Sequence, residues 1–168
     1  MTNNYPTVDD ISVFDVGNQE WDTKSGGQLS VLFRLDYNTL CNFLKYDTVE
    51  LKQIPEDIRG LRSYVVKNIP EGTVGGDEWH KVRTELVYVL AGSIKWKCTD
   101  LYGNTKEVII DTSTAVMTPH HILHTYEALV AGSIVSVLTN TLYIPENPST
   151  HDTYPRAEFE QLAMLLLS

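Results

Sequence analysis

Residues 72–92, with the sequence GTVGGDEWHKVRTELVYVLAG, concentrate chemically able side chains between two glycine-marked turns. Successive side chains on an extended strand point to opposite faces, so Glu78 and His80 share one face while Trp79 takes the other. This segment therefore predicts a strand that carries a carboxylate and an imidazole on the same side.

Glu85 follows a short basic turn and precedes residues 86–91, a continuous apolar run that is typical of a buried strand. A second polar segment, residues 119–126, holds three of the five histidines of the chain and ends at Tyr126. The candidate side chains Glu78, His80 and Glu85 and the three histidines of the second segment therefore lie in two separated segments.

The spacing of these two segments resembles the two sequence motifs of the cupin family. The matching residues are Gly72, Glu78, His80, Glu85 and Gly92 for the first motif, and Pro119 and His124 for the second. Glutamate stands at position 78, where the first histidine of the family motif is usual. The resemblance implies an all-β fold, the cupin double-stranded β-helix or jelly-roll barrel of the RmlC-like kind.

The remainder of the chain shows the short strands and turn signals of an all-β sandwich or barrel. Alternating or continuous apolar patterns predict strands over residues 31–37, 49–52, 60–69, 94–98, 108–110 and 133–138. Apolar residues at helical spacing after Pro155 predict a C-terminal helix. We expect an N-terminal arm or edge extension over residues 1–28, the barrel over residues 29–150, and a helix over residues 151–168 that packs on the barrel or on a partner.

Length, net charge and the positions of the cysteines limit the classes of protein to which the chain can belong. A length of 168 residues suits one domain with a substantial core, and the net charge of −9 argues against a nucleic-acid-binding surface. Cys41 and Cys98 are far apart in sequence and lack metal-ligand spacing. Because the chain starts without a signal-peptide pattern and has no apolar run long enough to span a bilayer, we expect a cytoplasmic protein that binds no membrane.

The cupin resemblance also implies a metal site. In metal-binding cupins, the two histidines and the glutamate of the first motif and the histidine of the second ligate one divalent ion. The corresponding residues here are Glu78, His80, Glu85 and His124. Imidazole and carboxylate ligands suit iron, manganese, nickel or zinc, and two buried carboxylates near each other favour a cation between them. The alternative is a hydrogen-bonded polar network without a metal.

A longer set of residues resembles the nucleotide-sugar 3,4-ketoisomerases, which are cupins that need no metal. The matching residues are Arg62, Tyr64, Pro70, Gly72, His80, Lys81, Gly92, Ser93, Pro119, His124, Thr141, Leu142 and Tyr143. This resemblance implies that His80 transfers protons, with Glu78 in place of the second catalytic histidine, and that Arg62 contacts the diphosphate. Glu85 stands where that subfamily usually has glutamine.

Three functions are consistent with these patterns. The first is a cupin that binds one divalent metal and acts on a small molecule, with the reaction class left open. The second is a metal-independent nucleotide-sugar isomerase or epimerase in which His80 and Glu78 are catalytic. The third is a non-catalytic ligand-binding cupin. The candidate substrate-binding residues are Arg62, Tyr64 and Tyr126, and family membership would make a homodimer the expected assembly.

Overall fold

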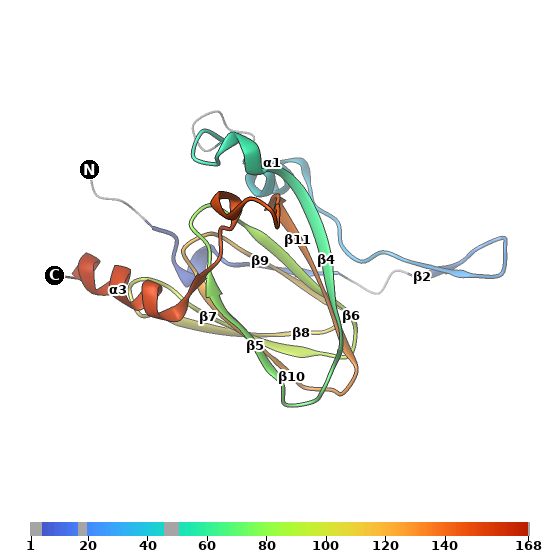
Figure 1. Ribbon diagram of the computed structural model, residues 1–168. Helices are drawn as coiled ribbons and strands as arrows, with labels where there is room; N and C mark the ends of the chain where they lie inside the picture. The colour runs from blue at the N-terminus through green and yellow to red at the C-terminus, as the bar shows by residue number, and fades with distance from the viewer. Residues whose placement is uncertain (1–4, 17–19, 46–50, 168) are drawn as a thin grey trace.

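Two five-stranded antiparallel sheets form the barrel in this computed structural model, which describes residues 5–16, 20–45 and 51–167 (Figure 1). The first sheet has the order β1 (Ser12–Asp15), β9 (Thr114–Thr118), β6 (Glu85–Ala91), β11 (Ser133–Thr141) and β4 (Arg59–Ile69). The second has the order β12 (Tyr154–Pro155), β5 (Val74–Trp79), β10 (Leu123–Ala128), β7 (Ile94–Thr99) and β8 (Thr105–Ile110). Strands distributed between two facing sheets in this way form a jelly roll, so the predicted cupin barrel is confirmed.

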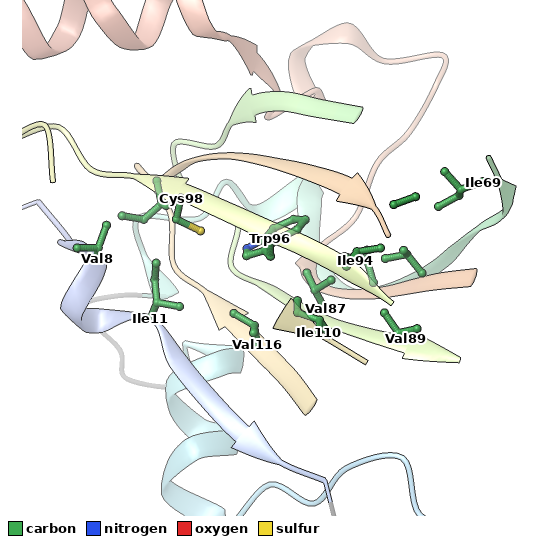
Figure 2. Packing of buried hydrophobic residues seen from close by; sticks show 14 residues of the cluster. Val8, Ile11, Ile69, Val87, Val89, Ile94, Trp96, Cys98, Ile110 and Val116 are labelled. Carbon is green, nitrogen blue, oxygen red and sulfur yellow. The ribbon is translucent and has the colours of Figure 1, made fainter. Parts of the chain in front are cut away.

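The hydrophobic core fills the space between the two sheets (Figure 2). Strand β7 shows how the sequence produces it: Ile94, Trp96 and Cys98 are buried, while Lys95 and Lys97 between them are more exposed. This alternation follows from the two-residue period of a strand. Burial of the inward side chains removes apolar surface from water, which is the main force that holds the two sheets together.

The strands predicted at residues 60–69, 94–98, 108–110 and 133–138 correspond to β4, β7, β8 and β11. The strand predicted at residues 31–37 is wrong, because residues 31–36 form no strand and the helix α1 (Tyr37–Leu44) begins there. The Asp36 side chain accepts a hydrogen bond from the backbone N–H of Thr39 at 2.7 Å, which satisfies a donor at the start of this helix. Of the strand predicted at residues 49–52, residues 49 and 50 lie outside the described residues, and Leu51 and Lys52 form no strand.

One part of the N-terminal region belongs to the barrel, and another part projects from it. The short helix η1 (Val8–Asp10) is followed by β1, which pairs with β9 at the edge of the first sheet. Both Val8 and Ile11 enter the hydrophobic core. Strands β2 (Glu20–Asp22) and β3 (Gln28–Ser30) form a hairpin that projects away from the barrel (Figure 1).

The C-terminal region returns to the second sheet. After the short helix η3 (Pro148–Thr150), strand β12 pairs with β5 and leads into the helix α3 (Arg156–Leu167). Phe159 of this helix is buried against Trp79, Leu101 and Leu123, while Leu165 and Leu167 are exposed. None of the helices in the described part of the chain is long and apolar enough to cross a membrane. The homodimer stays a prediction.

Candidate functional site

Glu85 lies at the centre of a polar cluster inside the barrel. It is the first residue of β6, and only 2 % of its surface is exposed. Its Oε1 atom lies 3.3 Å from His80 Nε2, and its Oε2 atom lies 3.5 Å from His124 Nε2. Since β5 and β10 belong to the other sheet, this carboxylate meets both imidazoles across the interior of the barrel.

Backbone carbonyls fix the orientation of both imidazoles. His80 Nδ1 lies 2.5 Å from the Asp152 carbonyl oxygen, and His124 Nδ1 lies 3.1 Å from that of Ile122. A carbonyl can only accept, so both Nδ1 atoms carry a proton, and both Nε2 atoms face Glu85. Trp96 stacks on His124 with an interplanar angle of 22° and holds that ring in its plane.

Glu85 is ionised in this environment. Burial acts to raise its pKa, but the neighbouring His80, His124 and Arg83 outweigh burial and lower the pKa from 4.5 to about 2. Burial lowers the pKa of His124, and Glu85 offsets only part of that effect. A carboxylate facing two Nε2 lone pairs would be repelled, so at least one Nε2 carries a proton, or a cation lies among the three groups.

The contact between His80 and Glu85 is an ion-pair approach rather than an aligned hydrogen bond, and the buried His80 Nε2 atom lacks a hydrogen-bond partner. This orphaned atom is the feature that a ligand or a metal would satisfy. One ligand atom each from Glu78, His80 and His124 lies within 4.8 Å of the other two. Metal-bound histidines commonly donate their other N–H to a carbonyl, as both do here. The residues therefore fit a divalent cation.

A cavity of about 220 Å³ opens beside this cluster. Its lining residues include Glu78, Glu85, His124, Tyr64, Tyr126 and Trp96, whereas His80 is not among them. A larger polar groove of about 880 Å³ lies elsewhere, against the N-terminal segment and α1, and its lining contains His120 but no member of the cluster. The inner cavity is therefore the candidate site, since it brings titratable groups and open space together.

Arg62 and Tyr64 extend the site along β4. The Tyr64 hydroxyl donates to Glu85 Oε1 at 3.4 Å, and burial together with Glu85 raises the pKa of Tyr64, so this phenol keeps its proton. The Arg62 guanidinium lies over the ring of Tyr64, 4.8 Å from its centroid, and over that of Tyr143 at 5.2 Å. Burial and the nearby Arg83 lower the pKa of Arg62, and its Nε atom has no hydrogen-bond partner.

Arg83 and Asp152 belong to the site although no sequence motif includes them. Only 2 % of Arg83 is exposed, and its Nη1 atom lies 3.8 Å from Glu85 Oε1, so it is no surface charge. Asp152 comes from the segment before β12. No sequence pattern marks Asp152, because its role depends on its contact with His80, which lies 72 positions away in the chain.

The Tyr126 ring fits on the cavity wall because Gly75, which faces it, has no side chain. Tyr126 pairs with Gly75 across β10 and β5, and a Cβ atom at Gly75 would lie 2.4 Å from the Tyr126 hydroxyl oxygen. We expect Gly75→Ala to displace this ring and to lower the free energy of unfolding by about 1–3 kcal/mol, the usual effect of overpacking. Urea denaturation measures the change.

Gly27→Ala in the projecting hairpin is the matched control, because the nearest atom to its Cβ would be 3.4 Å away. The double variant Gly75→Ala/Tyr126→Leu should recover part of the lost stability. Equal stability of Gly75→Ala and the wild type would contradict the close approach.

Comparison with protein families identifies the chain. The model of the FdtA family, described as WxcM-like, C-terminal, matches residues 42–155, which is more than half of the sequence. The chain belongs to this family. No curated protein matches it in sequence.

Solved structures share the fold of this FdtA-family chain. A 3,4-ketoisomerase from Helicobacter canadensis is 14 % identical with a TM-score of 0.61, over 92 % of this chain and 98 % of that one. A mutant of the sugar 3,4-ketoisomerase QdtA from Thermoanaerobacterium thermosaccharolyticum, in complex with TDP-4-keto-6-deoxyglucose, is 18 % identical with a TM-score of 0.59, over 93 % and 95 %. RmlC from Streptococcus suis, in complex with dTDP-D-xylose, is 16 % identical with a TM-score of 0.59, over 83 % and 69 %.

Proposed function

We propose that this FdtA-family chain isomerises a nucleoside-diphosphate-linked 4-keto sugar by moving a proton between two adjacent carbons. The observation that carries the proposal is the carboxylate–imidazole cluster, of which Glu78, Glu85 and His124 line the cavity of about 220 Å³. Family membership and the resemblance in fold to sugar 3,4-ketoisomerases add support. The fold alone would not assign the reaction, because one fold serves many functions.

Glu78 and His80 are the proposed proton carriers. Glu78 lines the cavity, and one of its oxygens lies within 4.8 Å of a His80 ring nitrogen. Glu78 takes the proton from C3 of the sugar, the C3–H electron pair forms the C3–C4 double bond, and the C4 oxygen gains a proton from His80. His80 then takes the proton of the C3 oxygen of the enediol, and C4 receives a proton from Glu78. Oxidation at C3 balances reduction at C4, so no external oxidant is required.

The nucleotide would lie outside the cavity. A volume of about 220 Å³ is smaller than the range of about 300–1,000 Å³ typical of pockets for drug-sized ligands, so it suits a sugar ring better than a whole nucleotide. Arg62 connects the cavity wall at Tyr64 with the exposed ring of Tyr143. A diphosphate at Arg62 would satisfy its orphaned Nε atom and offset the burial of its charge.

The experiment is incubation with TDP-4-keto-6-deoxyglucose in D₂O after exhaustive chelation, followed by NMR spectroscopy of the sugar. Proton transfer by side chains that exchange with the solvent predicts a 3-keto product with deuterium at C4. Calorimetry with TDP tests the nucleotide contact separately, with Arg62→Gln as the comparison. Absence of both turnover and TDP binding would refute the proposal.

A second candidate function is metal-assisted chemistry at the same site. The orphaned Nε2 atom of His80 and the convergence of Glu78, His80 and His124 favour it. These three side chains would hold the ion, with Glu85 beside them. A divalent ion would supply polarisation of a substrate carbonyl or hydroxyl.

Elemental analysis of untagged protein distinguishes the two candidates. Near-stoichiometric transition metal that is lost in His124→Ala, together with activity that disappears on chelation, would favour the metal-assisted function. A protein that takes up no metal when loaded would exclude it.

A further inference from the structure

The segment from Asp152 to Pro155, which ends in the edge strand β12 of the second sheet, contacts the site. Tyr154 pairs with Trp79 and Pro155 pairs with Glu78 in the β12–β5 ladder. The Thr153 hydroxyl accepts a hydrogen bond from Arg83 Nη1 at 3.3 Å, and that guanidinium faces Glu85. This short segment therefore contacts Glu78, His80 and Arg83.

The Asp152 side chain is the anchor of this segment. Its Oδ1 atom accepts from the backbone N–H of Lys81 at 2.8 Å, and its Oδ2 atom accepts from Val82 at 3.0 Å and Arg83 at 2.8 Å. Only 5 % of the residue is exposed. Three amide donors around one buried carboxylate form an anion-binding turn, and these charge-assisted bonds are stronger than neutral ones.

The Asp152 carbonyl oxygen reaches the imidazole that follows β5. It lies 2.5 Å from His80 Nδ1 and accepts the hydrogen bond that this nitrogen donates, while Nε2 faces Glu85. The carboxylate and the carbonyl of one residue therefore hold both ends of the turn that carries His80. Loss of the carboxylate would free the carbonyl to move away from the ring.

We propose that Asp152 is a positioning residue, which sets the proton-bearing nitrogen of His80 by clamping the backbone of residues 81–83. The effect on turnover rests on the proposed isomerase function. The effect on the His80 ring does not depend on that function, so an experiment can contradict the positioning role and the isomerase function independently.

The test uses Asp152→Ala and two readouts on the full chain. A proton NMR spectrum of the wild type should contain a low-field, slowly exchanging Nδ1–H signal, assigned to His80 by its loss in His80→Asn. We expect this signal to vanish in Asp152→Ala. Turnover should fall about 100-fold with little change in KM, because a displacement of about 1 Å in a catalytic group has an effect of this size.

Asp100→Ala is the matched control. Asp100 is also buried and accepts from the backbone N–H groups of Val8, Tyr102 and Asn104, at a place outside the site. It should lose stability as Asp152→Ala does but keep the His80 signal and the turnover of the folded fraction. Asp152→Asn, which retains an oxygen for two of the three donors, should lie between Asp152→Ala and the wild type in both readouts.

A His80 signal that persists in Asp152→Ala would overturn the proposal, as would a loss of turnover no larger than that of Asp100→Ala. If Asp152→Ala does not fold, Asp152→Asn provides the test. A wild-type His80 signal together with wild-type turnover in Asp152→Asn would overturn the proposal. Should the wild type lack isomerase activity, loss of the signal in Asp152→Ala and its retention in Asp100→Ala would still support the positioning role.

Discussion

Glu85→Gln is expected to lower the free energy of unfolding by about 3 kcal/mol at neutral pH. The reason is the pKa of Glu85, which falls from 4.5 to about 2 in the folded barrel. A difference of that size between the unfolded and folded states corresponds to about 3 kcal/mol. Glutamine keeps the shape of the side chain but leaves the buried guanidinium of Arg83 without the opposing charge at 3.8 Å.

The sign of this effect gives a pH dependence. Because the folded-state pKa lies below the unfolded-state value, the stabilisation is complete above pH 4.5 and is lost as the pH falls toward 2. Glu85→Gln should therefore lose less stability than the wild type over that interval. Urea denaturation at a series of pH values measures both curves.

Glu127→Gln is the control for the loss of a carboxylate. Glu127 pairs with Lys95 on the surface, where both side chains are about one-third exposed. Exposed pairs contribute about 0–1 kcal/mol, so this variant should remain near the wild type. Parallel acid curves for Glu85→Gln and the wild type would show that Glu85 is not held ionised by its neighbours.

His80→Asn is expected to reduce isomerase turnover by about 100- to 10,000-fold, the range that general acid–base groups contribute. The asparagine amide can still donate to the Asp152 carbonyl, which His80 Nδ1 reaches at 2.5 Å. It has no counterpart of Nε2 that can accept and return a proton at neutral pH. Turnover of TDP-4-keto-6-deoxyglucose, followed by NMR spectroscopy, measures the loss.

Glu78→Gln should cause a loss of similar size, because it keeps the side-chain shape and removes the proposed base. The double variant should lose little more than either single variant, since groups that act as a unit are not additive. His120→Asn, at a histidine that lines the outer groove, should keep the turnover of the wild type. Full activity of His80→Asn would remove that residue from the mechanism.

The sequence predicts the barrel because its strands follow local rules. The alternation in β7 is visible in three buried and two more exposed residues, and it requires no knowledge of the partner strand. The motif spacing likewise predicts that Glu78 and His80 lie close together. In the structure Glu78 lines the cavity, and a His80 ring nitrogen lies within 4.8 Å of a Glu78 oxygen. Local periodicity fails at α1, where alternating apolar residues precede a helix that the Asp36 side chain caps.

The parts of the site that depend on distant residues could not be predicted in this way. Arg83 looks like a charge in an exposed basic turn, and only the fold buries it against Glu85. Asp152 has no local pattern to mark it. Its importance comes from the return of the chain to β5, which no periodicity in either segment encodes.

The return of β12 to β5 also has a consequence for the order of folding. Chains fold from their N-terminus as they are synthesised, at about 5–20 residues per second. Strands β4 to β11 can pair before residues 152–155 have emerged, and the turn of residues 81–83 then lacks the carboxylate that binds its three amides. Non-local contacts form slowly because the loop between them must first close. The strands of the barrel can therefore pair before residues 152–155 bind the turn of residues 81–83, so this turn becomes ordered after the strands around it.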